Sequence, residues 1–480
     1  MQPRYETQMP PRPEQLEGLR RLAGKSAFAL LMAMRTGKTK TTLDDFGRLE
    51  LAKQVTDLLV IAPGGVYKTW AKAWVEHVSD DLQARGKVYV WDSGRRNTKS
   101  GKVELRAWLA HKGPRVLLLN VEALSTVQAA RDLCEQLLND GHCYVAIDES
   151  TCIKNPKAKR AKYIVQRLGP MARARRILSG LPTPRSPLDI FMQFNFLDPN
   201  ILGFRNYYGF RAHYAVMRKE NFNGRYVDIV VGYRNQEQLK AAIAPHSYRV
   251  EFRPNIPSTY TIEDVELSDE QRAAYQKMKT YSTFQIEKER HVTATIVISQ
   301  ILKLHQILCG FVKDEQGKVH PLKEHRTSKL MDVLDRGGGK AVIWCSYDYN
   351  VQRLTEKLIK EFGKPSVARF WGGNTATRED EEQRFLNDDA CQFMLATPHA
   401  GGKGRTWSCA DLVVYYSSTN DLELRDQSEQ RVQGVDKKRQ VDYVDLIAPN
   451  TVEGKILNAL RKKMNMAGMI TGSNWREWVV

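Results

Sequence analysis

Short apolar segments alternate with amphipathic segments along most of the chain. In the first part, apolar runs of strand length recur at residues 27–31, 58–62, 88–91, 116–120, 143–147 and 176–179. Helix-like stretches separate these runs, and this alternation is typical of right-handed βαβ units in a parallel sheet that is covered on both faces. The pattern predicts a first α/β lobe over residues 1–186.

The same alternation returns in the last third of the chain. Apolar runs occur there at residues 341–345, 368–371, 393–396, 412–416 and 443–447. Between the two alternating regions, residues 191–214 are rich in aromatics, and Ile301, Leu304 and Leu308 follow helical spacing. We therefore predict an α/β fold of two parallel-sheet lobes, with a helical insertion at 187–312 and a second lobe at 313–480.

Charge and cysteine content narrow the class of protein. The chain has 480 residues and a formal net charge of +18, which favours a polyanionic partner such as nucleic acid. Its seven cysteines include no C-x-x-C pair, which fits a reducing compartment. No apolar run approaches the roughly 18 to 20 residues that span a bilayer, and the amino terminus lacks the apolar core of a secretory signal. We expect a cytoplasmic protein without a membrane segment.

The segment from Met34 to Thr39 reads Met-Arg-Thr-Gly-Lys-Thr and connects an apolar run to a helical pattern. This is the context of a phosphate loop, in which backbone N–H groups at a helix N-terminus bind phosphate oxygens. We expect Arg35, Thr36 and Gly37 to line the nucleotide phosphates, Lys38 to neutralise them and the Thr39 hydroxyl to bind Mg²⁺. Met32 occupies the position of the first glycine of the full pattern, so a solvated helix start is the alternative.

Two acidic residues follow the apolar run at 143–147. Asp148 and Glu149 stand where a phosphate-loop ATPase carries one carboxylate that orients Mg²⁺ and a second that polarises the attacking water. Acidic pairs at strand ends are common, but the order of Lys38 and this pair along the chain favours the catalytic interpretation. ATP and Mg²⁺ are the expected cofactors.

Taken together, these motifs resemble the Swi/Snf-type branch of the superfamily-two helicases, which are ATP-driven double-stranded DNA translocases. The resemblance runs nearly end to end and implies two RecA-like lobes. Residues 12–19 resemble the Q motif, so Gln15 is an expected adenine contact. Residues 61–63 and 120–122 resemble motifs Ia and Ib, which implies that Pro63 and Asn120 lie along the DNA backbone. Residues 179–182 resemble motif III, with Leu181 in place of the usual threonine.

In the second lobe the resemblance includes one departure. Residues 397–404 resemble motif V, which implies that Thr397 contacts DNA and that Gly402 and Gly404 approach the nucleotide. Residues 427–434 resemble motif VI, in which Arg431 matches the first arginine, whereas Gly434 replaces the arginine finger. A finger is worth on the order of 10³ to 10⁵ in rate. A substitution that traps a bound state, natural decay of the ATPase, and replacement of the finger by Lys437, Lys438 or Arg439 all remain open.

A basic stretch follows the acidic pair. Residues 151–180 contain nine lysines and arginines and no acidic residue. We expect this segment, with Lys157, Lys159 and Arg160, to bind DNA phosphates, whereas a merely solvated face is the alternative.

The resulting hypothesis is an ATP-dependent double-stranded DNA translocase or helicase-like motor. It would hydrolyse ATP between its two lobes and act as a monomer in a bacterial or phage setting. Two other functions stay open: a hydrolysis-deficient clamp that binds ATP and DNA, suggested by Gly434, and a helicase that unwinds RNA or forks.

Overall fold

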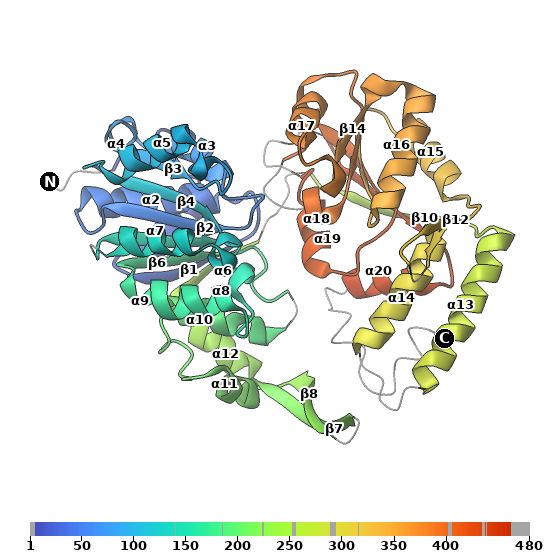
Figure 1. Ribbon diagram of the computed structural model, residues 1–480, viewed down its shortest axis with the longest axis horizontal. Coiled ribbons are helices and arrows are strands. Elements are labelled where there is room, and N and C mark those ends of the chain that lie inside the picture. The colour runs from blue at the N-terminus through green and yellow to red at the C-terminus, as the bar shows by residue number, and fades with distance from the viewer. Residues whose placement is uncertain are drawn as a thin grey trace. The chain divides into compact units, whose positions relative to one another are not determined.

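The computed structural model describes residues 5–461 except 140, 185, 223–224, 252–255, 289–293, 315, 402–405, 434–436 and 438. The chain divides into two compact units (Figure 1). Unit 1 comprises Met1–Val216 and Gly232–Arg253, and unit 2 comprises Met217–Val231 and Pro254–Val480. Each unit contains one large parallel sheet with helices, which confirms the predicted α/β class with two parallel-sheet lobes.

Unit 1 is built on a seven-stranded sheet in which every pair of neighbours is parallel. The strand order is β3 (Lys87–Val90), β4 (Arg115–Asn120), β2 (Asp57–Ala62), β5 (Cys143–Asp148), β6 (Ala174–Leu178), β1 (Ala27–Met32) and β9 (Ser247–Val250). Every residue of β2 and β5 is buried. The nearly continuous apolar sequence of these strands follows from their cover on both faces.

The longer connections of unit 1 are helical (Figure 1). Its helices are α1 (Pro13–Leu22), α2 (Lys38–Leu51), α3 (Thr69–His77), α4 (Asp80–Arg85), α5 (Lys99–Leu109), α6 (Ala123–Thr126), α7 (Gln128–Leu138), α8 (Lys159–Tyr163), α9 (Gly169–Met171), α10 (Ile190–Leu197), α11 (Tyr207–Tyr214) and α12 (Gln236–Ile243). Alternate strand residues such as Leu30, Val60 and Ala146 form one core with Phe46 of α2 and Trp70 of α3. This packing holds α2 and α3 against one face of the sheet.

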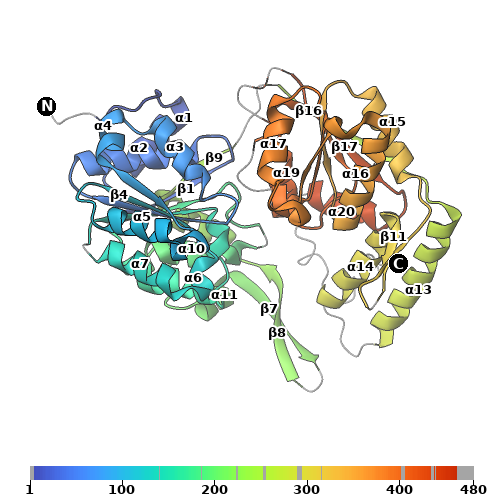
Figure 2. The same cartoon turned by 45° about the horizontal axis from the view of Figure 1, so that its top comes forward.

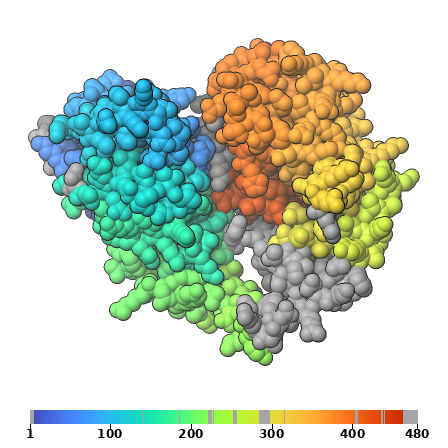
Figure 3. All heavy atoms as spheres, viewed as in Figure 1, coloured from blue at the N-terminus to red at the C-terminus, as the bar shows by residue number. Residues whose placement is uncertain are grey.

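Unit 2 has a six-stranded sheet that is also parallel throughout. The order is β10 (Thr259–Asp264), β17 (Asp442–Ile447), β16 (Ala410–Tyr415), β13 (Lys340–Trp344), β15 (Phe393–Ala396) and β14 (Val367–Phe370). Its helices are α13 (Asp269–Lys288), α14 (Ala294–Leu308), α15 (Arg326–Arg336), α16 (Asp348–Phe362), α17 (Arg378–Asn387), α18 (Pro398–Gly401), α19 (Leu422–Glu429) and α20 (Val452–Arg461). In the space-filling view, the segment with α16 and α17 forms the orange surface of this unit (Figure 3).

Two short antiparallel ribbons complete the described strands. β7 (Ala215–Phe222) pairs with β8 (Arg225–Tyr233), and β11 (Phe311–Lys313) pairs with β12 (Val319–Pro321). The ribbon of β7 and β8 extends as an arm in both ribbon views (Figures 1 and 2).

Residues 187–312, predicted as a helical insertion, contain strands as well as helices. They hold α10 to α14 but also β7 to β10, and they are shared between the two units rather than forming a third one. β9 extends the edge of the unit 1 sheet, and β10 extends the edge of the unit 2 sheet. β10 reads Thr-Tyr-Thr-Ile-Glu-Asp and is largely exposed. An edge strand of this composition lacks the apolar run that identifies the central strands.

Candidate nucleotide-binding site

The parallel sheet of unit 1 gathers the predicted motifs at one edge. Because its strands run in the same direction, the loops that follow β1, β2, β4, β5 and β6 all leave from the carboxyl edge, where ligands bind in open α/β sheets. These loops and the strand ends before them carry the phosphate-loop segment, Pro63, Asn120, the acidic pair and Gly180. Only β6 separates β1 from β5, so the sheet order brings the loop of Lys38 and the loop of Asp148 to neighbouring positions.

The segment after β1 forms a tight loop that ends at a helix N-terminus. The Ala33 N–H donates to the Val250 carbonyl at 2.8 Å, and the Thr36 hydroxyl donates to the Ala33 carbonyl at 2.7 Å. Gly37 precedes α2 with a φ of 89°, and no side chain caps the helix there. The first N–H groups of a helix have no partner within it, so this 14-residue helix presents donors and a positive dipole end suited to an anion.

Lys38 points its ammonium into this region without a partner. Its side chain is 8% exposed, and its Nζ makes no hydrogen bond with any part of the chain that the structure describes. A Cβ placed on Gly180 would lie 3.6 Å from Nζ, so the loop after β6 packs beside it. A buried ammonium without a partner is costly, and a phosphate would relieve that cost. The residues present therefore fit a nucleotide phosphate.

Gln15 lies against the phosphate loop. Its side chain is 3% exposed, and its Oε1 accepts from the Arg12 N–H at 2.8 Å. The Arg12 guanidinium donates to the Arg35 carbonyl at 2.9 Å. A Cβ on Gly37 would come within 1.8 Å of the Gln15 Nε2. The positive φ of Gly37 favours glycine at this position, and a larger residue would also displace the Gln15 amide.

Asp148 is held by two hydrogen bonds at the end of β5. Its Oδ2 accepts from the Trp70 indole N–H at 2.9 Å, and its Oδ1 accepts from the Glu149 N–H at 2.9 Å. Asp148 is 5% exposed, and Glu149 has a φ of 48°. Each oxygen keeps lone-pair capacity, so the carboxylate fits the oxygen ligation that Mg²⁺ prefers. The contribution of Trp70 was not predicted, because the spacing of a helix residue and a strand residue in sequence does not show that they meet.

The nine basic residues of the stretch 151–180 are not all unopposed in the folded chain, although the stretch itself contains no acidic residue. Arg176 is fully buried and pairs with Asp45, to which its Nε donates at 3.0 Å. Arg167 forms an ion pair with Glu135 at 2.8 Å. Opposite charges distant in sequence therefore meet these arginines in the folded chain. Lys157 and Lys159 are exposed, whereas Arg160 is half-buried, with its Nε donating to the Cys152 carbonyl at 3.3 Å.

The other predicted DNA contacts of unit 1 lie where two strands of the sheet end. Pro63 is buried at the end of β2, and its carbonyl accepts from the Val66 N–H at 2.8 Å. Asn120 is half-buried at the end of β4 and donates to Glu122 at 3.5 Å. Both lie at the carboxyl edge, where the sequence placed them, and their contact with DNA stays a prediction.

In unit 2 the predicted residues also follow strands or helices of the parallel sheet. Thr397 follows β15 and is 6% exposed, and Arg431 follows α19 and is 2% exposed. A Cβ on Gly401 would come within 2.6 Å of Trp407, so only glycine fits this end of α18. Gly402, Gly404 and Gly434 lie outside the described residues.

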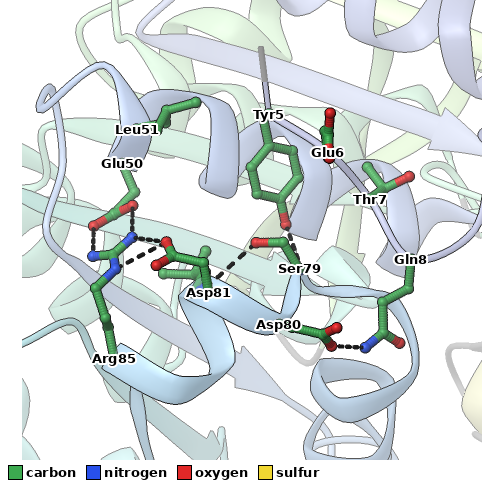
Figure 4. Close-up of a pocket in the computed structure, with 11 residues that line it drawn as sticks. Tyr5, Glu6, Thr7, Gln8, Glu50, Leu51, Ser79, Asp80, Asp81 and Arg85 are labelled. Carbon is green, nitrogen blue, oxygen red and sulfur yellow. Dashed lines mark hydrogen bonds and ion pairs between the residues drawn. The ribbon is translucent and has the colours of Figure 1, made fainter. Parts of the chain in front are cut away.

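A pocket of about 380 Å³ lies at the opposite end of α2 from Lys38 (Figure 4). Its acidic side chains are Glu6, Glu50, Asp80 and Asp81, and Arg85 pairs with Glu50 at 2.7 Å and Asp81 at 2.9 Å. The surplus of carboxylates disfavours a phosphate-bearing ligand. This pocket is therefore distinct from the candidate nucleotide site.

A buried cluster of His305, Cys309 and Glu453 in unit 2 has the residue types of a metal site. Glu453 is engaged, however, because the Arg326 guanidinium donates to its Oε2 at 2.5 Å and His305 faces its Oε1 at 3.3 Å. The Glu453 carboxylate thus lies within ion-pairing distance of two cationic groups, although its Oε1 and the His305 Nε2 make no hydrogen bond among the described residues.

Fold and site together define a class: an α/β protein with two parallel sheets, in which an uncapped helix N-terminus follows β1 and a buried carboxylate ends β5, one strand away at the same edge of the sheet. The family model described as the SNF2-related domain matches residues 21–315, more than half of the chain. The chain therefore belongs to the SNF2-related family and is a Swi/Snf-type member of the superfamily-two helicase-like proteins.

Several known proteins are similar to it. The TATA-binding protein-associated factor mot1 of Aspergillus fumigatus is 26% identical over 384 residues, covering 68% of this chain and 20% of the relative. TATA-binding protein-associated factor 172 of Homo sapiens is 24% identical, with 68% and 20% covered. An uncharacterised ATP-dependent helicase of Mycoplasma genitalium is 24% identical, with 67% and 30% covered. The chain thus spans less than a third of the length of these relatives.

Among solved structures, the SWI2/SNF2 ATPase core of Sulfolobus solfataricus in complex with dsDNA is similar at 21% sequence identity and a TM-score of 0.41. The match covers 96% of this chain and 92% of that chain.

Across the described residues, no helix has both the length and the apolar character needed to cross a bilayer.

Proposed function

We propose that the chain is an ATP-dependent motor that acts on double-stranded DNA. The observation that carries the proposal is the unpartnered, buried ammonium of Lys38 at an uncapped helix N-terminus, with the Asp148 loop only one strand away. Membership of the SNF2-related family supports the same function.

In this proposal, unit 1 binds the nucleotide. The α2 N-terminus and Lys38 bind the phosphates, Gln15 contacts the adenine, and Thr39 and Asp148 hold Mg²⁺. Glu149 orients the attacking water. When bound, MgATP supplies the cleavable phosphoanhydride, and the protein contributes mainly positioning and charge neutralisation.

The DNA contacts would come from basic side chains near this edge. Lys157 and Lys159 are exposed in the segment that follows the acidic pair, and the net charge of +18 favours a polyanion. Hydrolysis would alter the grip on the phosphate backbone, with Arg431 of unit 2 contributing to the nucleotide-bound state. We infer contacts to backbone phosphates rather than to base edges, so binding would be largely independent of sequence.

ATP turnover with and without duplex DNA tests the proposal. We expect duplex DNA to stimulate hydrolysis and the Lys38→Ala variant to lose nearly all turnover, because the phosphates lose their buried counter-charge. Lys72→Ala, at an exposed lysine on α3, is the matched control and should retain turnover. Stimulation by RNA or single strands in place of duplex DNA would instead support an unwinding helicase.

A second candidate rests on Gly434. In this case ATP binds to the wild-type chain and binds more weakly to Lys38→Ala, but no nucleic acid elicits turnover. The chain would then be a clamp that binds ATP and DNA without hydrolysis.

A further inference from the structure

A buried glutamine outside the predicted motifs connects the two loops that flank the candidate nucleotide site. Gln193 lies on α10 and is fully buried. Its Oε1 accepts from the Ser150 hydroxyl at 2.6 Å, and its Nε2 donates to the Pro182 carbonyl at 2.7 Å and the Asp189 carbonyl at 2.8 Å. The orientation of the amide follows from its partners, because two carbonyls require a donor.

The two loops joined by Gln193 carry the residues of the site. Ser150 directly follows Glu149 and is itself fully buried. Pro182 belongs to the loop after β6, in which Gly180 packs against Ala33 and the Lys38 Nζ. The contact therefore connects the acidic loop to the loop that packs on the phosphate-binding segment.

These hydrogen bonds are costly to break. In a buried environment, a hydroxyl, an amide and a carbonyl that lose their partners retain the full penalty of desolvation. The two loops are thus expected to keep their relative position or to move together.

The acidic loop also continues into the basic segment. Ser150 begins a short 3₁₀ helix, Ser150–Ile153, and the exposed Lys157 and Lys159 follow within ten residues. A DNA backbone bound by Lys157 and Lys159 would therefore contact the segment that begins at Ser150, which Gln193 holds by a hydrogen bond.

We propose that Gln193 is a positioning residue that couples DNA binding to ATP turnover by tying the Ser150 loop to the Pro182 loop. The proposal rests on the proposed function for its DNA dependence, whereas the mechanical connection between the loops does not.

The first experiment measures the connection without nucleotide or DNA. Ser150→Ala removes a single oxygen from one loop, and we expect it to raise hydrogen–deuterium exchange in residues 180–184 of the other loop. Asn195→Leu is the matched control on α10, because its Oδ1 is buried without a hydrogen bond among the described residues. It should leave exchange in residues 180–184 unchanged. Unchanged exchange in Ser150→Ala would overturn the connection.

The second experiment is a double-mutant cycle on ATP turnover. We expect Ser150→Ala and Gln193→Met each to reduce the stimulation by duplex DNA about five-fold or more, the scale of coupling between sites. Turnover without DNA and the Kd for duplex DNA should stay close to wild type. The double variant should be no worse than either single variant, because both remove the same link.

The outcomes separate the two ideas. A wild-type chain without DNA-stimulated turnover would contradict the proposed function, and the exchange experiment would still decide the connection. Stimulation unaltered in Ser150→Ala, or effects that add in the double variant, would overturn the coupling role. If Gln193→Met lowers the Tm strongly, Ser150→Ala alone decides, since it preserves the glutamine and its two carbonyl contacts.

Discussion

At the scale of single residues, the site depends on how each charge is held. Lys38 has no hydrogen-bond partner among the described residues, whereas both oxygens of Asp148 accept a hydrogen bond. The first arrangement favours an incoming anion, and the second fixes a carboxylate without neutralising it. Local sequence was enough to propose these two residues, but the hydrogen bond from Trp70 to Asp148 could not be predicted from it.

Trp70 offers a test of that orientation. Trp70→Phe keeps an aromatic ring on α3 but removes the N–H that donates to Asp148. Loss of an outer hydrogen bond to a metal ligand typically costs 10- to 100-fold in metal affinity, so we expect the Mg²⁺ concentration for half-maximal turnover to rise about ten-fold or more. Titration of turnover with Mg²⁺ at saturating ATP measures this.

Trp74→Phe is the control for Trp70→Phe. Trp74 lies one turn later on α3 and is also buried, where its ring packs near Phe46. Its substitution should leave the Mg²⁺ dependence unchanged. An equal shift in both variants would mean that packing of α3, and not the hydrogen bond, sets the position of Asp148.

At the scale of elements, a buried cluster of charged residues connects three helices of unit 2. Arg326 of α15 donates to Glu453 of α20, to the Tyr416 carbonyl and to the Leu446 carbonyl. His305 of α14 pairs with the same Glu453 and contacts the Tyr347 hydroxyl at 2.9 Å. Three helices are therefore connected through one carboxylate, which no local pattern indicates.

This cluster should make the stability of unit 2 depend on pH. Burial by itself lowers the pKa of His305, but neighbouring Cys309 and Glu453 outweigh this and raise it from 6.5 to about 10. Burial by itself raises the pKa of Glu453, but Arg326 and His305 lower it from 4.5 to about 2. The histidine contribution is complete below pH 6.5 and is lost as pH rises to 10, whereas the glutamate contribution is lost as pH falls from 4.5 to 2.

Urea denaturation near pH 6 and near pH 9 measures the histidine contribution. We expect unit 2 of the wild-type chain to lose stability between these values, by at most about 1.4 kcal/mol per pH unit. His305→Gln should lose much less over the same interval, because no proton is released. His320→Gln removes a half-exposed histidine and should behave as wild type. A wild-type-like loss in His305→Gln would contradict the assignment.

At the scale of the whole molecule, the formal net charge of +18 is expected to favour binding of DNA. Not every basic residue is available, since Arg176 and Arg167 pair with acidic residues within unit 1. The surface contribution is therefore expected from exposed lysines rather than from the full count of positive charges.

Charge reversal tests this at Lys157 and Lys159. We expect the double variant Lys157→Glu/Lys159→Glu to weaken duplex binding and to reduce the slope of log Kd against log salt by about one for each phosphate that is no longer neutralised. Lys99→Glu/Lys102→Glu changes the net charge equally at two exposed positions on α5. Equal losses in both double variants would indicate a general charge effect instead of direct binding of phosphates by Lys157 and Lys159.

The replacement of the expected arginine finger by Gly434 also belongs to this scale, because position 434 and the phosphate loop belong to different units of the chain. We expect Gly434→Arg to raise DNA-stimulated ATP turnover about ten-fold or more, since a finger is worth on the order of 10³ to 10⁵ in rate. Gln433→Arg introduces the same side chain one residue earlier and serves as the control. An unchanged rate in Gly434→Arg would exclude a missing finger as the limit on turnover.

The sequence by itself determined the central strands, the parallel α/β class, the position of Lys38 at the start of the helix after β1 and the position of Asp148 at the end of β5. These features are local, because buried parallel strands read as apolar runs and the candidate residues lie close to those runs in the sequence. Tertiary structure alone decided the order of the strands and the addition of β9 and β10 at the sheet edges. It also decided the pairing of Arg176 with Asp45 and the contact of Gln193 with Ser150. Each of these features depends on which residues distant in sequence become neighbours in space, and the spacing of residues along the chain does not determine that.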